Sequence, residues 1–294
     1  MSLYETLWFF AAYSFLGWVI EVIYHAVCCG KIVNRGFLNG PICPVYGFGI
    51  LAILYTVSFL PKDASGGPSH LFLFIDGMLI ASAIEFLAGY LLDRIYHTRW
   101  WDYSDIPFNL GGYICLKFSL LWGLGTSFMV RVVHPTVNAL TAGGIPERIG
   151  YGLLALIYIV GFSDLIATVI MLRGIARNLK ELDRIRTELR KPSEALTRVI
   201  GTNAIKAQNM TAELGVQAAL AKAELRDASA ERVAATREQL ELKAAAIRAK
   251  FTEHSVFGYG RIFMAFPKLA HHKYRETAAE LAEKVRRRWY GSGS

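Results

Sequence analysis

Five apolar runs constrain the fold of this chain more than any other feature of its sequence. Each run has about 20 or more residues, which is the length that a helix needs to cross a lipid bilayer. Backbone polar groups inside a bilayer must be hydrogen bonded within the protein, so long apolar runs predict helices there. We therefore expect an all-α integral membrane protein whose residues 1–176 form a five-helix transmembrane bundle. The expected spans are residues 3–28, 41–60, 71–96, 110–133 and 149–175.

The rest of the chain has a different character, because charged residues crowd the positions after the fifth run. Apolar residues recur there at three- and four-residue spacing among the charges, which is typical of amphipathic helices. Residues 177–256 are predicted to form a cytoplasmic helical stalk or hairpin. Their alanine-rich stripe lets helices approach closely, as in a coiled coil, although the heptads are irregular. Residues 257–290 are predicted to form a basic, helical C-terminal tail, and residues 291–294 resemble a cloning remnant.

The distribution of Lys and Arg predicts how the bundle is oriented. Basic residues gather in the first loop, in the third loop and after the fifth run, which share one side if five helices cross the membrane. The side richer in Lys and Arg faces the cytoplasm by the positive-inside rule. We therefore expect a multi-pass protein of the bacterial cytoplasmic (inner) membrane with a cytoplasmic C-terminus. The net charge of +8 suits an anionic membrane surface as well as nucleic acid. For a chain with five apolar runs, membrane lipid is the expected partner and nucleic acid is not.

Ionisable side chains inside the apolar runs are candidates for a functional site, because burying a charge in a bilayer is costly. Glu21, Glu85 and Asp164 each lie nine or ten positions before the basic residue that ends their run. At 1.5 Å per residue they lie roughly 13–15 Å above the inner boundary, and they are expected to share one layer. Lys117 lies a few residues into the fourth run from the same side, within reach of this layer.

Two interpretations of the carboxylate layer remain open from the sequence. In the first, a polar cavity opens to the cytoplasm and its carboxylates bind or conduct a cation or small ligand, with Lys117 modulating them. In the second, Lys117 neutralises one acid and hydrogen bonds satisfy the others, so that the charges only hold the bundle together. Three acids against one lysine favour the first interpretation, since an unpaired buried carboxylate is costly.

Two loops on the same side have an unusual composition and are expected to form a gate or ligand site below the carboxylates. Residues 35–47 include three glycines and two prolines, which impose an irregular backbone path. Residues 100–115 combine paired tryptophans with polar side chains suited to one small ligand. No cofactor or metal site is expected, because the four cysteines lack metal-site spacing. The candidate ligand-binding residues of these loops and the adjoining helix end are Arg35, Asn39, Tyr46, Asp93, Trp101, Asp102, Tyr103 and Asn109.

The motifs in residues 35–47, 101–104, 108–115 and 119–123 are specific in combination. They resemble the bacterial membrane proteins known as type IV ABC-transporter permeases, the CmpB-like family. The likeness covers the whole membrane half, and residues 265–274 are similar to that family's C-terminal tail. This resemblance implies a membrane transport class without an established substrate. The chain contains no Walker A pattern, so an ATPase would be a separate subunit.

The leading hypothesis is a permease or channel-like protein in which Glu21, Glu85 and Asp164 bind or relay a cation. One alternative is a membrane-anchored scaffold or sensor whose helical tail recruits a cytoplasmic partner. Another is an enzyme at the inner leaflet with Asp102 as base, which is less favoured because no nucleophile–base–orienter set can be assembled. A homo-oligomer is also expected from the long helical tail, with a dimer favoured.

Overall fold

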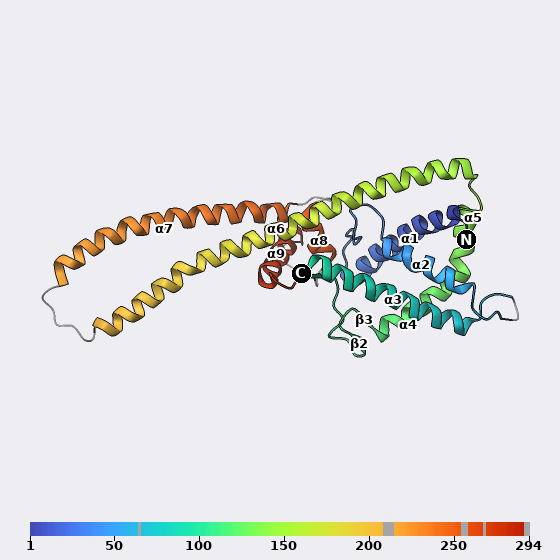
Figure 1. Cartoon of the computed structure of the whole chain (residues 1–294), viewed down its shortest axis with the longest axis horizontal. Coiled ribbons are helices and arrows are strands. Elements are labelled where there is room, and N and C mark those ends of the chain that lie inside the picture. Colours follow the sequence, from blue (N-terminus) through green and yellow to red (C-terminus); the bar gives the residue numbers. More distant parts are fainter. Residues whose placement is uncertain (64–65, 208–214, 254–257, 267–268, 291–294) are drawn as a thin grey trace.

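The computed structural model describes residues 1–63, 66–207, 215–253, 258–266 and 269–290, apart from the side chains of residues 191–233, 270 and 290. Within these residues the chain is mostly helical (Figure 1). The helices are α1 (Leu3–Cys29), α2 (Pro44–Val57), α3 (His70–Tyr96), α4 (Leu116–Phe128), the π-helical turn η1 (Met129–Val133), α5 (His134–Leu140), α6 (Glu147–Ala207), α7 (Gly215–Thr252), α8 (Tyr259–Ala265) and α9 (Arg275–Tyr290). The short strands are β1 (Thr98–Arg99), β2 (Asn109–Leu110), β3 (Ile114–Cys115) and β4 (Ala270–His271).

Among the described residues, four helices are long and apolar enough to cross a membrane, as expected of a membrane protein. They are α1, α3, the combined helix Leu116–Leu140, and α6 as far as Arg190. The expected second span, residues 41–60, forms only the 14-residue helix α2. At 1.5 Å per residue α2 is about 21 Å long, which is short of a hydrocarbon core of about 30 Å. Four full-length helices and the shorter apolar helix α2 therefore stand where five spans were expected.

The short α2 results from the path of the first loop, which enters the bundle before the helix begins. The backbone N–H of Cys43 donates to the carbonyl of Ser14 (2.9 Å), a residue in the middle of α1. Pro44 then starts α2, where its restricted φ suits a first helical position. Irregular backbone is tolerated at membrane depth where the protein satisfies its polar groups, and here α1 supplies one such partner.

The boundaries of the fourth and fifth expected spans also differ from the prediction. Residues 110–115 belong to the β2–β3 hairpin, so the fourth helix begins at Leu116 and continues through η1 to Leu140. Pro135 lies in this helix just after η1, and the wider π-helical turn accommodates a proline that would otherwise clash with the preceding turn. The expected domain boundary at residue 176 does not interrupt α6, which is one continuous helix of 61 residues.

The first loop, the third loop and the C-terminal segments lie at one end of the bundle, and the N-terminus lies at the other (Figure 1). Beyond the loop end, α6 continues away from the bundle and α7 returns beside it, with Lys243 Nζ 2.6 Å from Glu181 Oε1. At the N-terminal end, the Tyr4 hydroxyl donates to the carbonyl of Ile145 (2.9 Å). The two loops with unusual composition are therefore neighbours of the tail.

The largest buried apolar cluster lies at the junction between the bundle and the tail. It joins residues 171–185 of α6, 244–251 of α7, 262–265 of α8 and 274–285 around α9. The bundle, by contrast, exposes many large apolar side chains, such as Leu156, Ile159 and Phe162 of α6. Exposed apolar surface of this extent is typical of a surface that meets a membrane. The tail is thus packed against the base of the bundle, and β4 pairs with β1 of the third loop.

Helices α1–α2 and α3–α4 form two copies of one helix–loop–helix unit. The same residue types recur along the two units at one constant spacing, with Asp in place of Glu at one position. The pairs are Gly17 and Gly89, Glu21 and Asp93, Tyr24 and Tyr96, His25 and His97, Gly40 and Gly112, Ile42 and Ile114, and Cys43 and Cys115. Helices α2 and α4 begin at positions related by the same spacing, and both follow an extended cysteine N-cap. The bundle therefore contains an internal repeat in which Glu21 and Asp93 are equivalent.

Candidate functional site

Glu21 lies on α1, where residues from the first loop and α2 converge on its carboxylate. Arg35 Nη1 lies 3.1 Å from Glu21 Oε2. The Tyr46 hydroxyl donates to Glu21 Oε1 at 2.7 Å. Gly17 lies one turn earlier on α1, and its lack of a side chain leaves room for the Tyr46 ring. Glu21 is therefore an ion-paired carboxylate with one cationic and one neutral partner.

Glu85 on α3 has only neutral hydrogen-bond partners among the described residues. The Tyr103 hydroxyl donates to Glu85 Oε1 (3.1 Å), and Trp122 Nε1 donates to Oε2 (2.8 Å). Burial, together with the nearby charge of Glu85, raises the pKa of Tyr103, so this phenol stays protonated and donates. The Trp122 ring meets the Tyr46 ring edge-on, with centroids 5.7 Å apart. Contacts through Trp122 and Tyr46 therefore connect Glu85 with Glu21 across four helices.

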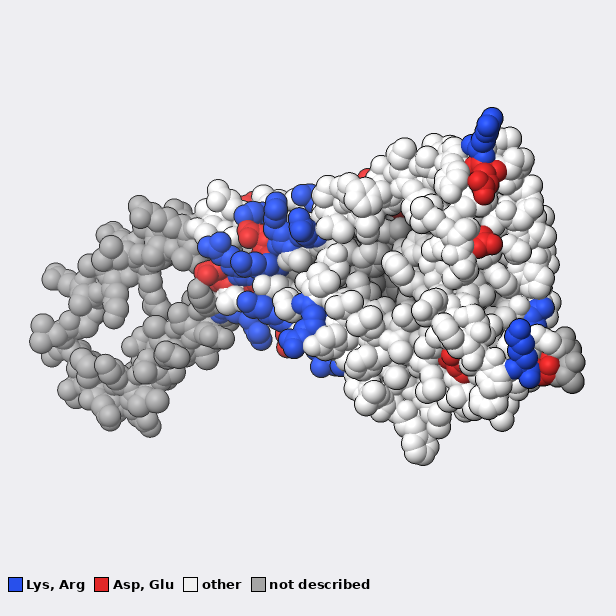
Figure 2. Space-filling model, turned by 45° about the vertical axis from the view of Figure 1, so that its right-hand side comes forward, with Lys and Arg blue, Asp and Glu red and all other residues white. Residues whose placement is uncertain are grey.

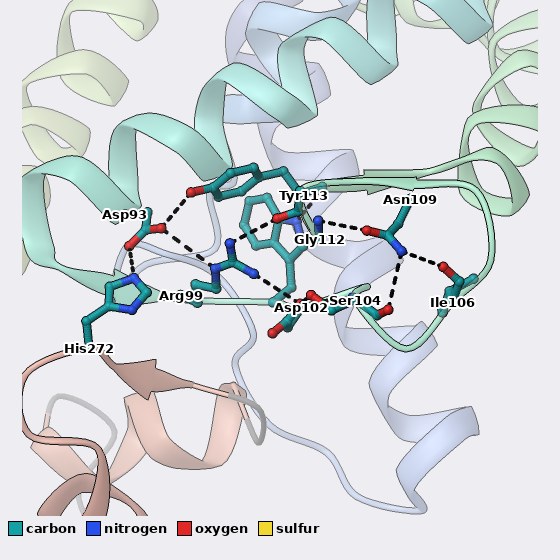
Figure 3. Close-up of polar contacts among 11 residues, drawn as sticks. Asp93, Arg99, Asp102, Ser104, Ile106, Asn109, Gly112, Tyr113 and His272 are labelled. Carbon is teal, nitrogen blue, oxygen red and sulfur yellow. Dashed lines mark hydrogen bonds and ion pairs between the residues drawn. The ribbon is translucent and has the colours of Figure 1, made fainter.

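Asp93 lies in the last turn of α3 and is the centre of a second polar network (Figure 3). The Tyr113 hydroxyl donates to Asp93 Oδ2 (2.6 Å), and Arg99 Nε lies 3.7 Å from the same oxygen. His272, which follows β4 in the tail, has its Nε2 2.6 Å from Asp93 Oδ1. Each repeat thus surrounds its carboxylate with a tyrosine hydroxyl and an arginine. In the second repeat the tail adds a histidine.

Arg99 links Asp93 to the third loop. Its guanidinium lies between Asp93 and Asp102, with Nη1 3.2 Å from Asp102 Oδ1 (Figure 3). Burial disfavours the charged form of Asp102, but hydrogen bonds from Ser104 and the charge of Arg99 outweigh it and lower the pKa of this carboxyl. Asp102 is therefore held ionised by structural contacts, which makes it a weak base.

Trp101 and Asn109 hold the β2–β3 hairpin in place. Trp101 Nε1 donates to the carbonyl of Tyr113 (2.8 Å). The Asn109 amide donates to the carbonyl of Ile106 (2.8 Å) and accepts from the backbone N–H of Gly112 (3.1 Å). These two candidate ligand-binding residues use their polar groups within the loop, so they shape the hairpin that carries Tyr113.

Asp164 and Asn39 hold the first loop inside the bundle. The Asp164 carboxylate accepts from the backbone N–H of Asn39 (3.2 Å), from that of Gly40 (2.7 Å) and from Asn39 Nδ2 (3.0 Å). Asn39 Nδ2 also donates to Thr168 Oγ1 (3.0 Å). Asp164 therefore satisfies donors of an irregular backbone segment.

Arg261 of α8 connects the tail to this loop, and only 2% of its surface is exposed. Its guanidinium donates to the carbonyls of Gly36 (2.8 Å) and Asn34 (3.2 Å) and to Asn39 Oδ1 (3.3 Å). Burial lowers the pKa of Arg261 to about 10, which still leaves it charged at neutral pH. Asn39 thus bridges the cation of Arg261 and the anion of Asp164.

The expected layer of three carboxylates divides into two sets. Glu21 and Glu85 are connected through aromatic side chains, whereas Asp164 binds the first loop. Lys117 is exposed in the first turn of α4, and its Nζ lies 5.8 Å from the centroid of the adjacent Phe118 ring. Among the described residues, the cation paired with this layer is therefore Arg35, in place of the expected Lys117.

Four residues that bind these carboxylates or the first loop were not among the candidates chosen from the sequence: Tyr113, Trp122, Arg261 and His272. The internal repeat is a signal that would have paired Asp93 with Glu21, but it does not point to Tyr113, because the equivalent position in the first repeat is Pro41. Arg261 and His272 lie in the tail, far along the chain from their partners. Arg261 is 225 positions from Gly36, and His272 is 179 positions from Asp93. No local sequence pattern connects residues at such separations.

Comparison with known proteins gives one family. The family model described as "Putative ABC-transporter type IV" matches residues 8–169, which is more than half of the chain. The matched segment contains Glu21, Glu85, Asp93 and Asp164, and it ends before Arg261 and His272 of the tail. No curated protein and no solved structure matches the chain.

Proposed function

Because the chain belongs to this type IV ABC-transporter family, we propose that it is a multi-pass membrane permease or channel-like protein that binds or conducts a cation. The family and the four apolar helices support a membrane protein related to transport. In the proposal, Glu21 and Glu85 hold the cation or proton, and the bundle lies in the bacterial inner membrane with the tail in the cytoplasm. Any ATPase that energises it is a separate subunit.

The contact set from Glu21 through Tyr46 and Trp122 to Glu85 is the observation that carries this proposal. A carboxylate inside a membrane bundle is costly unless it is paired, and such residues mark ion or proton pathways. Glu21 is paired with Arg35, but the described partners of Glu85 are the neutral donors Tyr103 and Trp122. Neutral donors satisfy the hydrogen-bonding oxygens of the half-buried Glu85 carboxyl but supply no positive charge, so a cation or proton is needed to neutralise it.

The first loop is the proposed gate. Arg35 of this loop forms an ion pair with Glu21. The loop backbone is also hydrogen bonded to Asp164 of α6 and to Arg261 of the tail. Movement of this loop would remove Arg35 and free Glu21 for a cation. The conformation described here is accordingly a closed one, in which the tail holds the gate.

The test is cation flux through purified full-length protein in proteoliposomes, measured with K⁺ and H⁺ gradients and a fluorescent indicator. Glu21→Gln and Glu85→Gln keep side-chain size but remove the charge. We expect each variant to reduce flux by at least about tenfold, which corresponds to a loss of about 1.4 kcal/mol in the free energy of cation binding. Asp76→Asn is the matched control, because Asp76 lies on α3 but its described partner is Thr56, outside the contact set. Equal flux through wild type, both Glu variants and the control would contradict the role of Glu21 and Glu85.

A second candidate is a scaffold or sensor in which the tail reads the state of the bundle. It is supported by Arg261 and His272, which connect tail segments to the first loop and to Asp93. Absence of flux through the full-length chain would favour this second candidate, and, if flux is found, a chain ending at Arg190 tests what the tail contributes. If flux survives the deletion, the role of the tail is regulation or assembly, for example formation of a homodimer. If flux is lost, the tail is part of the transport unit.

A further inference from the structure

A cavity of about 750 Å³ lies at the junction between the bundle and the tail, away from Glu21 and Glu85. Its walls come from the end of α3 and the start of the third loop (residues 95–100), from α6 (residues 169–180), and from the tail (residues 262–274). It is partly open to the surroundings. The proposed function does not use this cavity.

The lining of the cavity combines an apolar wall with a basic rim. Ile95, Leu172 and Leu269 contribute to the apolar wall. The rim contains four Lys or Arg residues and three histidines, and no Asp or Glu is found among the described residues that line the cavity. The basic residues are Arg173, Arg177, Lys180, Lys273, His97, His271 and His272.

Three of these cations form one row. Arg173, Arg177 and Lys180 follow at spacings of four and three residues, so they share one face of α6. All three are exposed, and within the described part of the chain neither they nor Lys273 form an ion pair. Positive charge that is not paired with a carboxylate attracts an anion.

The surroundings of His271 also show an excess of positive charge at the cavity. Its Nδ1 accepts a hydrogen bond from the backbone N–H of Tyr274 (3.2 Å). Burial, followed by the charges of His97, His272 and Lys273, lowers the pKa of His271. His272 has a carboxylate partner in Asp93, which is not part of the cavity lining. The remaining cations are free to bind an anion from outside the chain.

The cavity also lies at the level where a lipid headgroup would be. The uninterrupted apolar stretch of α6 ends at Leu172, just before Arg173, and α3 ends at Tyr96, so both walls mark the same boundary of the bundle. Figure 2 shows Lys and Arg gathered in a belt where the apolar surface ends. Basic pockets between membrane helices at this level suit anionic headgroups, and the neighbouring apolar wall suits acyl chains.

We propose that this cavity binds an anionic phospholipid. The phosphate group lies on the row of Arg173, Arg177 and Lys180, with Lys273 facing it from the tail. The acyl chains lie along Ile95 and Leu172 toward the apolar surface of the bundle. Because α3, α6 and the tail all line the cavity, a bound lipid joins the tail to the bundle.

The experiment uses native mass spectrometry of the full-length protein in detergent. Dioleoyl phosphatidylglycerol is compared with dioleoyl phosphatidylcholine, which has the same chains but no net charge, and with water-soluble glycerol 3-phosphate. The variant Arg173→Gln/Arg177→Gln/Lys180→Gln removes three charges from the rim. The matched control Arg184→Gln/Lys250→Gln/Arg288→Gln removes three exposed charges that do not line the cavity. Thermal unfolding without lipid checks that both variants fold as the wild type does.

We expect phosphatidylglycerol to be retained by the wild type and the control, and to bind the rim variant at least about tenfold more weakly, since each Lys or Arg contributes about 1 kcal/mol. The single reversal Arg177→Glu should weaken binding in the same direction. Equal retention of phosphatidylcholine, or unchanged phosphatidylglycerol binding in the rim variant, would overturn the proposal. Glycerol 3-phosphate bound as tightly as the lipid would also overturn it, because the acyl chains would then contribute nothing.

Discussion

Arg261 shows at the scale of one residue how the tail is joined to the bundle. A buried guanidinium needs acceptors for its N–H groups, and the irregular first loop has carbonyls that its own backbone does not satisfy. Arg261 meets both needs, because it donates to Asn34, Gly36 and Asn39. A planar guanidinium with five N–H donors can bind several loop oxygens at once, whereas a lysine ammonium has a different shape and fewer donors.

Replacing Arg261 should therefore destabilise the protein. Arg261→Met is expected to lower the free energy of unfolding by at least about 2 kcal/mol, because hydrogen bonds to a charged group contribute about 1.5–3 kcal/mol. Arg261→Lys is expected to be nearly as destabilising as Arg261→Met. Chemical unfolding of the purified protein in detergent measures the effect. Arg237→Met is the control, since the Arg237 side chain is exposed and pairs only with Glu241 in the described structure. Equal destabilisation by both variants would contradict this account.

At the scale of helices, glycines determine how closely the two helices of each repeat pack. Gly17 of α1 leaves room for Tyr46 of α2, and Gly77 of α3 leaves room for Thr126 of α4. Membrane helices associate through close packing, because lipid removes the hydrophobic drive that joins helices in water. The glycine at position 17 thus also positions the tyrosine that binds Glu21.

Gly17→Ala is expected to disturb both packing and the Glu21 site. An added Cβ would overlap the Tyr46 ring, which must then move away from Glu21. Overpacking of this kind costs about 1–3 kcal/mol of stability. Gly49→Ala on α2 is the control, because no atom lies within 4 Å of its added Cβ. Thermal unfolding and the flux assay measure the two effects, and a Gly17 variant as stable and active as the Gly49 variant would refute the packing argument.

At the scale of the whole molecule, the functional loops and the tail share one end. β1 of the third loop pairs with β4, His272 binds Asp93, and Arg261 binds the first loop. The tail is thus connected to both repeats of the bundle. A change in the tail can reach Glu21 and Asp93 through these contacts.

This arrangement predicts which thiols react from which side of the membrane. Cys28 and Cys29 are exposed near the loop end of α1, whereas Cys43 and Cys115 are buried. A membrane-impermeant maleimide should label the wild type in inside-out vesicles and not in right-side-out vesicles. The Cys28→Ser/Cys29→Ser variant should lose this labelling. Adding Ser2→Cys to that variant should restore labelling from the opposite side only, and labelling of both positions from one side would contradict the topology.

Much of the membrane half could be predicted from the sequence, since hydropathy and helical spacing are local properties. The apolar runs indicated the long helices, and the depth argument selected Glu21 and Glu85, which the structure connects through Tyr46 and Trp122. The motifs of the two loops also indicated the family. Helix ends were less predictable, because the first loop and the β2–β3 hairpin replace helical turns with contacts to distant residues.

The sequence by itself thus determined the membrane class, the family and the acidic positions of the bundle, because each depends on residues close together in the chain. Tertiary structure alone decided that Arg35 pairs with Glu21, that Asp164 holds the first loop, and that Arg261 inserts from the tail. Such contacts depend on how helices pack and how buried polar groups find partners. The Arg261 contact with Gly36 spans 225 positions, and no local pattern encodes a partner at that distance.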